Sequence, residues 1–106
     1  MDAPRPGPTY DLATIKALVS SGQFVVTGEA LNGAGELGFD RSDIVACVMS
    51  LTAADFHKTM PSIKKQGLWQ DVYRPVHSGI ALYVKLQLAA RSDGRALSVV
   101  VQFKRK

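Results

Sequence analysis

The sequence predicts an α+β fold in one domain, with N-terminal helices packed on one face of a mainly antiparallel sheet. The first half of the chain holds helix-start signals followed by apolar residues at helical spacing, whereas the second half alternates apolar and polar residues as strands do. Helices that precede a run of strands, instead of alternating with them, are typical of the α+β class. A length of 106 residues fits a single domain, which we take to span residues 1–106.

The N-terminal residues and the cysteine content indicate the setting of the protein. Residues 1–9 contain three prolines and no apolar run, so we expect a flexible tail and no secretory signal. No apolar stretch approaches the roughly 18–20 residues of a membrane span, so no membrane association is expected. Cys47 is the single cysteine, which excludes an internal disulfide and favours a cytoplasmic location. We expect it to pack as a small hydrophobic residue.

The two halves of the chain differ in charge. Residues 1–56 contain three basic and seven acidic residues, a net charge of −4, whereas residues 57–106 contain ten basic and two acidic residues, a net charge of +8. Such a division within a small domain favours a basic face that binds a polyanion. A solvated basic surface without a specific partner is the alternative.

Three helices are predicted before residue 51. Asp11, Thr27 and Asp40 can each cap a helix, because each precedes apolar residues at helical spacing. Gly22 is placed to end the first helix, since glycine readily adopts the left-handed conformation found after a helix C-terminus. A short strand is predicted over residues 24–26, between the first two helices.

A fourth, short helix is predicted from residue 53 to residue 60. Thr52 and Asp55 have the spacing of a capping box, and Pro61 disfavours helical geometry in the residue before it. This prediction places Lys58 near the end of a helix.

The segment Gly33–Gly38 reads GAGELG and matches the G-x-G-x-x-G pattern of dinucleotide-binding proteins. In those proteins the glycines follow a strand and open a helix within a βαβ unit, a context that this chain does not offer. We therefore interpret these glycines as turn and cap residues.

The strands are predicted in the second half. Residues 62–67 are expected to form a mobile basic loop, followed by a strand over residues 68–74 that Pro75 ends. After a turn at residues 76–79, residues 80–90 alternate almost perfectly and predict a half-buried strand.

Asp93-Gly94 predicts a two-residue hairpin turn, in which the numbers of paired residues sum to 187. This register places Tyr83 opposite Lys104 and Lys85 opposite Gln102, so that a phenol and an ammonium are neighbours on the polar face. On the apolar face, it pairs Leu82, Val84, Leu86 and Leu88 with Arg105, Phe103, Val101 and Val99. The polar face, which also carries Gln87, is expected to remain uncovered.

Several motifs of the chain resemble the MqsR family of bacterial toxins. The most specific is WQDVYRP at Trp69–Pro75, and DFHKTM at Asp55–Met60 adds to it. The A-L-N…E-L-G run of residues 30–38 and the spacing of Tyr83 from the C-terminal Lys104 also agree. The resemblance extends from about Tyr10 to Lys104. It implies a RelE-like α+β fold and an mRNA endoribonuclease activity.

The resemblance also implies the active-site residues, which are Lys58, Gln70, Tyr83 and Lys104. Two features depart from the family pattern. His57 precedes Lys58 where other members have tyrosine, and the hairpin has extra residues near 91–95. His57 is a possible acid or base, since histidine titrates near neutral pH.

These residue types suit RNA cleavage by attack of the 2′-hydroxyl on the adjacent phosphorus. Lys58 and Lys104 can stabilise negative charge on the phosphate, and Gln70 can hold a phosphate oxygen or a base edge. Tyr83 is a candidate acid or base, and we expect Lys104 to favour its phenolate form. The residues expected to bind RNA are Lys64, Lys65, Arg74 and Lys85. Neither a metal site nor a cofactor is expected, because the two histidines and one cysteine lack metal-ligand spacing.

The leading hypothesis is a metal-independent, sequence-selective mRNA endoribonuclease toxin. The resemblance implies a cognate antitoxin similar to MqsA, with a zinc-binding segment and a helix-turn-helix, that neutralises it. A catalytically silent module that binds RNA or the ribosome is one alternative. Another is a regulator that acts at a promoter together with its antitoxin.

Overall fold

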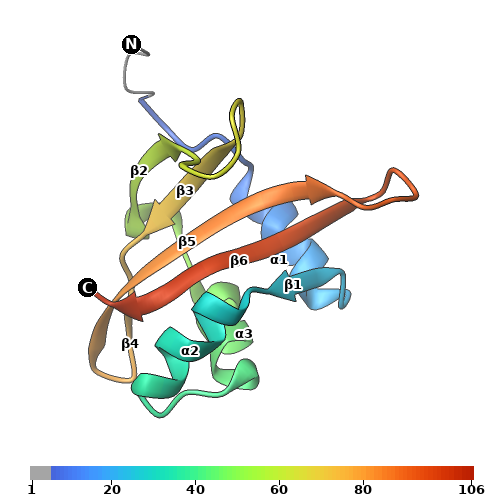
Figure 1. Cartoon of the computed structure of the whole chain (residues 1–106). Coiled ribbons are helices and arrows are strands. Elements are labelled where there is room, and N and C mark those ends of the chain that lie inside the picture. The colour runs from blue at the N-terminus through green and yellow to red at the C-terminus, as the bar shows by residue number, and fades with distance from the viewer. Residues whose placement is uncertain (1–5) are drawn as a thin grey trace.

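The structure, a computed structural model, describes residues 6–106 and confirms the α+β class (Figure 1). Helices and strands follow one another along the chain in this order: α1 (Leu12–Ser20), β1 (Phe24–Val26), α2 (Gly28–Glu36), α3 (Arg41–Ser50), the 3₁₀ turn η1 (Ala53–Asp55), β2 (Phe56–Pro61), β3 (Trp69–Tyr73), β4 (Val76–His77), β5 (Ile80–Ala90) and β6 (Ala96–Arg105).

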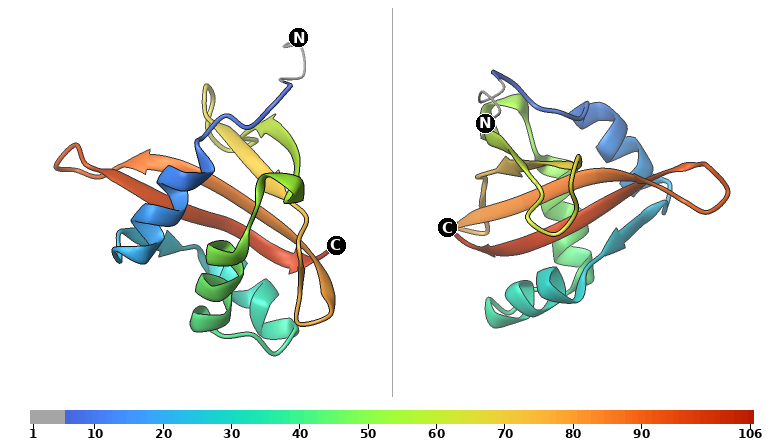
Figure 2. Two further views of the ribbon diagram at one scale, coloured as in Figure 1. Left: turned by 180° about the vertical axis from the view of Figure 1, so that it is seen from behind. Right: turned by 45° about the horizontal axis from the view of Figure 1, so that its top comes forward.

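The sheet is mixed but mostly antiparallel. Its strands lie in the order β1-β6-β5-β3-β2, and β4 pairs separately with β5. Only the pairing of β1 with β6 is parallel among the described strands. Seen from behind, α1 and α3 cover one face of this sheet, while α2 lies along β6 (Figure 2). None of the described helices covers the opposite face over β3 and β5, where the loop of residues 62–68 forms one side of a groove.

The predicted helix caps are confirmed. The carboxylate of Asp11 accepts a hydrogen bond from the Thr14 backbone N–H at 3.1 Å, and Thr27 Oγ1 accepts one from Ala30 at 3.1 Å. Asp40 forms a reciprocal capping box with Asp43. These bonds satisfy N–H groups that the first turn of a helix leaves without partners.

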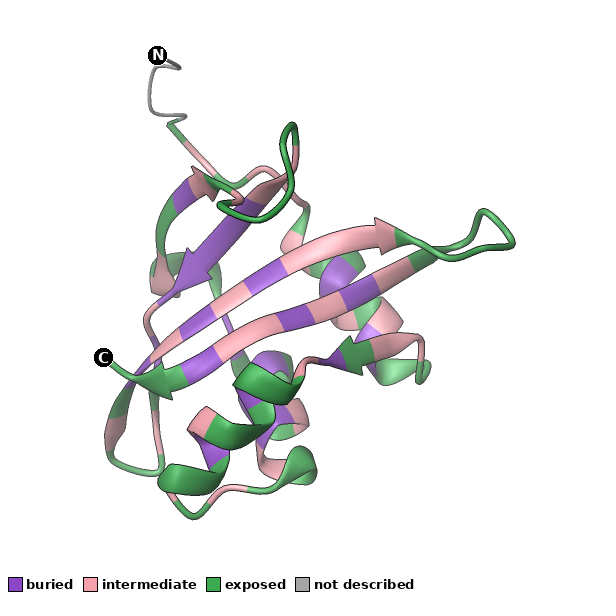
Figure 3. Cartoon of the chain, in the orientation of Figure 1, coloured by how far each residue is buried: buried purple, intermediate pink, exposed green. Residues whose placement is uncertain are grey.

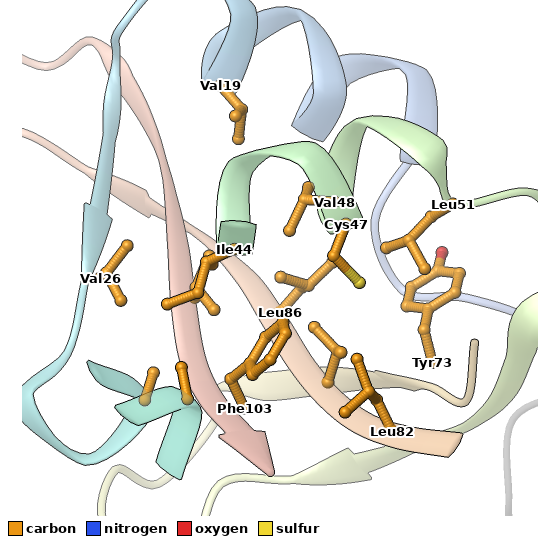
Figure 4. Packing of buried hydrophobic residues seen from close by; sticks show 14 of the residues in the cluster. Val19, Val26, Ile44, Cys47, Val48, Leu51, Tyr73, Leu82, Leu86 and Phe103 are labelled. Carbon is orange, nitrogen blue, oxygen red and sulfur yellow. The ribbon is translucent and has the colours of Figure 1, made fainter. Parts of the chain in front are cut away.

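The hydrophobic core lies between the covered face of the sheet and the helices (Figure 4). Along β5 and β6, buried residues alternate with partly exposed ones, as expected for strands with one covered face (Figure 3). Cys47 is fully buried in this core, which confirms its predicted packing role. Burial raises the pKa of the Cys47 thiol to about 11.

The predicted helix over residues 53–60 is wrong. Asp55 does accept a hydrogen bond from the Thr52 N–H at 2.9 Å, but this interaction supports only the single turn η1. Residues Phe56–Pro61 instead form the edge strand β2, which pairs with β3. Long-range pairing with a strand outweighs a local helix signal here, and Pro61 ends β2 at the edge of the sheet, where it is tolerated.

The hairpin between β5 and β6 differs from the prediction in its turn. The Arg91 N–H bonds to the Arg95 carbonyl at 2.7 Å, so the loop has three residues and ends at Gly94 with φ 84°. Near the loop, paired residue numbers sum to 186, and beyond a β-bulge they sum to 187. Leu86 therefore pairs with Val100, not with Val101 as predicted, and Leu88 pairs with Ser98, not with Val99.

The bulge restores the predicted register where it matters for the polar face. Tyr83 pairs with Lys104 and Lys85 pairs with Gln102, as predicted. The extra residue is Val101, whose carbonyl accepts a hydrogen bond from Thr27 Oγ1 at 2.7 Å. Thus the residue that caps α2 also holds the bulge, which fixes the start of α2 beside the open face.

The predicted turn at residues 76–79 is tighter than expected. Val76 and His77 form the short strand β4, paired with Ala81 and Ile80 of β5. Ser78 and Gly79, both with positive φ, make the turn between them.

The N-terminal segment is tied to β3 from Thr9 onward. The Asp71 carboxylate, fully buried, accepts hydrogen bonds from the backbone N–H groups of Thr9 and Tyr10, both at 2.9 Å. The tail predicted over residues 1–9 therefore does not extend to Thr9, and residues 1–5 lie outside the described part of the chain.

Helix α2 approaches the backbone of β6 closely at Gly33. A Cβ atom at this position would overlap the carbonyl oxygen of Phe103 and would lie 3.6 Å from Lys104 Cβ. The helix could be this close to the strand only with glycine here.

We therefore expect Gly33→Ala to lower the free energy of unfolding, even though alanine favours helices. Overpacking typically costs about 1–3 kcal/mol, which exceeds the gain of about 1 kcal/mol from replacing glycine in a helix. Gly35→Ala is the matched control, because nothing lies within 4 Å of a Cβ added there. Urea denaturation of both variants measures the difference, and equal stability of the two would contradict the close approach.

Candidate active site

A groove of about 610 Å³ lies on the open face of the sheet. Its floor comes from β3, β5 and β6, one wall from residues 62–68, and the other from the start of α2. The right-hand view of Figure 2 shows the loop that contains residues 62–68 in front of β5. Three of the four residues implied by the family resemblance line this groove: Gln70, Tyr83 and Lys104.

The strand registers align four side chains in a row across the sheet. Lys58 of β2 pairs with Val72 of β3, Val72 pairs with Lys85 of β5, and Lys85 pairs with Gln102 of β6. Side chains at directly paired positions point to the same face of a sheet. The fully buried Val72 therefore separates two lysines on the open face.

Tyr83 stands between two cations. The centroid of its ring lies 5.0 Å from Lys104 Nζ and 5.9 Å from Lys85 Nζ. The hydroxyl contacts Met60 Sδ at 3.9 Å, which is a weak hydrogen bond. Burial raises the pKa of Tyr83. This direction is opposite to the predicted one, because desolvation of the phenolate outweighs the attraction of Lys104, which lies over the ring.

Lys85 lines the groove from β5 and is half-buried. Burial is the largest influence and lowers its pKa, because desolvation disfavours the ammonium form. Among its charged neighbours, Glu29 raises the pKa, whereas Lys104 and Lys58 lower it.

Two glutamine side chains are held in fixed orientations. Gln70, only 8% exposed, donates from Nε2 to Gln87 Oε1 at 2.9 Å. Gln102 donates from Nε2 to Glu29 Oε1 at 3.2 Å. The first bond leaves the Gln70 amide oxygen available to a ligand, and the second joins α2 to β6 at the groove wall.

The remaining predicted residues lie at different distances from this groove. Lys64 and Lys65 line it from the loop. Lys58 is not among the lining residues, although its charge acts on Lys85 across Val72. The structure does not bring His57 or Arg74 into the groove. Instead, Arg74 Nη1 lies 3.4 Å from His57 Nδ1, at the irregularity where β2 begins.

Sequence reasoning missed two features of the groove. Glu29 is the one acidic residue among its described lining residues, and its position depends on the docking of α2, which no local pattern reveals. Ile63 lines the groove although it is 91% exposed. An apolar residue within a basic loop was the sequence feature that could have identified it as a binding residue. An exposed apolar side chain beside cations is suited to contact a nucleobase.

Within residues 6–106, no group of three or more His, Cys, Asp or Glu side chains is placed to hold a metal ion. The same part of the chain contains no helix with the length and apolar character needed to cross a membrane.

Comparison with known proteins identifies the family of the chain. The family described as "Motility quorum-sensing regulator, toxin of MqsA" matches residues 7–105. The mRNA interferase toxin MqsR of Escherichia coli (strain K12) is 37% identical over 79 residues, which cover 74% of this chain and 81% of the relative. Because the family match spans nearly the whole sequence, this chain belongs to the MqsR family of toxins.

Proposed function

We propose that this protein is an mRNA endoribonuclease toxin that cuts RNA selectively and without a metal ion. Its groove binds single-stranded RNA, and the 2′-hydroxyl of one nucleotide attacks the adjacent phosphorus to give a 2′,3′-cyclic phosphate. Membership of the MqsR family and the similarity to an mRNA interferase toxin of E. coli support the activity. The observation that carries the proposal is the placement of Tyr83 between Lys85 and Lys104, beside Gln70 in one groove.

Each side chain has a role that its position supports. Lys104 stabilises the negative charge that develops on the phosphate oxygens, and Lys58 adds positive charge from outside the groove lining. Gln70 holds a phosphate oxygen or a base edge, because its bond to Gln87 fixes the amide. Tyr83 donates a proton to the departing 5′-oxygen, which its raised pKa favours over a role as base. His57, which lies near the start of β2 and outside the groove lining, remains a possible acid or base only for RNA that extends beyond the groove.

A cleavage assay tests the proposal. Purified protein is incubated with single-stranded RNA in the presence of EDTA, and the 3′ ends are identified by mass spectrometry. We expect cleavage with a 2′,3′-cyclic phosphate, because the lysines supply the positive charge that a metal ion would otherwise provide. A 2′-deoxy substitution at the cleaved nucleotide should abolish the reaction. Absence of cleavage both on free mRNA and on translating ribosomes would favour a silent RNA-binding module.

We also propose that a cognate antitoxin neutralises the toxin. The family description names MqsA as the partner of this class of toxin, and we expect a similar zinc-binding, helix-turn-helix protein. Co-expression with an MqsA-like antitoxin should restore growth, and the purified complex should show no cleavage. Cleavage by the complex equal to that of the free toxin would contradict neutralisation.

RNA affinity should depend steeply on salt, because phosphate contacts release counterions. Lys64→Ala combined with Lys65→Ala should reduce the slope of log K against log salt by about 1.4, since each single-strand phosphate contact contributes about 0.7. Gln66→Ala, in the same exposed loop, is the control that leaves the charge unchanged. Binding is measured with a 2′-deoxy substrate analogue. An unchanged slope in the double variant would exclude phosphate contacts by this loop.

A further inference from the structure

We propose that Lys85 is a catalytic residue, the general base that takes the proton of the attacking 2′-hydroxyl. The inference rests on the proposed function and extends it. Cleavage needs one group that accepts a proton and another that donates one. Of the four residues implied by the family resemblance, two are lysines assigned to charge stabilisation, one is a glutamine that does not titrate, and Tyr83 is assigned the role of acid. This leaves the base unassigned.

The location of Lys85 supports this role. It lies beside Tyr83 on β5, with Nζ 5.9 Å from the ring centroid of Tyr83, and it lines the same groove. Its neighbours in the row are the apolar Val72 and the neutral Gln102. A phosphate bound in the groove beside Lys104 would therefore lie next to both Lys85 and Tyr83, which could act on the two oxygens on either side of phosphorus.

The environments of Lys85 and Tyr83 move their proton affinities in opposite directions. A phenol ordinarily loses its proton at slightly lower pH than a lysine ammonium, near 10 compared with about 10.4. In this groove burial raises the pKa of Tyr83 and lowers that of Lys85. Opposite shifts in two neighbouring groups are the usual mark of an acid and a base.

Charged groups from every surrounding element contribute to the proton affinity of Lys85. Lys58 of β2 and Lys104 of β6 repel its ammonium form, and Glu29 of α2 attracts it. Glu29 thus acts as a positioning residue, because its carboxylate stabilises the ammonium form of Lys85 and raises the pKa of that group. The other titrating groups that line the groove are Tyr83, Lys64 and Lys65.

The proton balance of the step is complete. The neutral amine of Lys85 takes the proton of the 2′-hydroxyl as the 2′-oxygen bonds to phosphorus. The bond between phosphorus and the 5′-oxygen breaks, and Tyr83 gives its proton to that oxygen. The products are a 2′,3′-cyclic phosphate and a 5′-hydroxyl. Proton exchange with water then returns Lys85 to the amine and Tyr83 to the phenol.

Lys85→Arg tests the base, because arginine keeps the positive charge but holds its proton at every working pH. We expect binding of a 2′-deoxy RNA to remain within about threefold, while kcat/KM falls by about 100- to 10,000-fold, the usual contribution of a general base. In the unmodified protein kcat/KM should rise with pH up to the pKa of Lys85, and the variant should lose this rise. Arg41→Met, which removes a charge at the start of α3, should leave the profile unchanged.

Glu29→Gln is a second test with a directional result. Removing the carboxylate takes away the one neighbour that raises the pKa of Lys85, so the rising part of the pH profile should move to lower pH. A merely structural role for Glu29 would lower activity without moving the profile. A profile that stays in place would contradict the proposed electrostatic link between Glu29 and Lys85.

Chemical restoration of the amine provides the third test. Lys85→Cys, treated with 2-bromoethylamine, carries a lysine-like amine that is a weaker base than lysine. Cys47 is the only native cysteine, fully buried with a pKa raised to about 11, so the reagent should modify position 85 selectively. We expect the modified protein to regain cleavage, with the rising part of its profile at lower pH than in the unmodified protein.

The outcomes separate this inference from the proposed function. No cleavage by the unmodified protein would overturn both. Cleavage by the unmodified protein together with a Lys85→Arg variant that keeps activity within tenfold and the same pH profile would overturn only the role of Lys85.

Discussion

Lys104→Ala should reduce kcat/KM for RNA cleavage by about 100- to 1000-fold, the usual loss when one donor to a transition-state oxyanion is removed. The loss should appear mainly in kcat, because the negative charge on phosphorus grows between the bound substrate and the transition state. Lys58→Ala should act in the same direction, but less strongly, since Lys58 is not among the residues that line the groove.

Arg105→Ala is the matched control for Lys104→Ala. Arg105 is the next residue of β6 and is also exposed, but its side chain points to the other face, where it pairs with Leu82. The Arg105→Ala substitution therefore removes one positive charge from the same strand without changing the groove. Single-turnover kinetics separates binding from chemistry. Equal losses in the two variants would indicate a general effect of net charge and contradict a specific role for Lys104.

Tyr83→Phe should reduce cleavage by about 100- to 10,000-fold, the range for loss of a general acid. The fold should persist, because within residues 6–106 the hydroxyl makes only the weak contact with Met60, and the ring keeps its place beside the two lysines. Circular dichroism and urea denaturation check the fold, and rapid-quench assays measure the rate.

A modified substrate distinguishes proton donation from other roles of the hydroxyl. When sulfur replaces the bridging 5′-oxygen, the leaving group departs without protonation. Tyr83→Phe should then cut this substrate nearly as fast as the unmodified protein does. If the variant is equally active on ordinary RNA, Tyr83 only stacks on a base, and if the sulfur substrate is not rescued, the hydroxyl instead holds the phosphate.

Local sequence signals predicted the elements that depend on local interactions. The caps at Asp11, Thr27 and Asp40 depend on hydrogen bonds within one turn, and the alternation along β5 depends on its own two faces. For this reason the pairing of Tyr83 with Lys104, and hence the main feature of the groove, could be read from the sequence. That prediction assumed a two-residue turn, and it succeeded because the bulge at Val101 compensates for the additional loop residue.

The features that were missed depend on contacts between distant segments. Phe56–Pro61 follows the helix-start signal of Thr52 and Asp55, and it becomes a strand because β3 pairs with it. Glu29 reaches the groove because Thr27 binds the bulge and Gly33 allows α2 to approach β6. The pKa of Tyr83 is raised because the side chain is buried. The predicted strand register gives the neighbours of Tyr83 but not its degree of burial.

The position of β6 in the sheet has a consequence for synthesis of the protein. β6 is made after every other described strand, yet it lies between β1 and β5 and pairs with both. It also carries Phe103 and Val100 of the core, together with Lys104. Until β6 leaves the ribosome, β1 has no partner and the groove lacks one side, so an unfinished chain can have neither the native sheet nor the cleavage activity. The groove is therefore completed only after β6 has emerged from the ribosome.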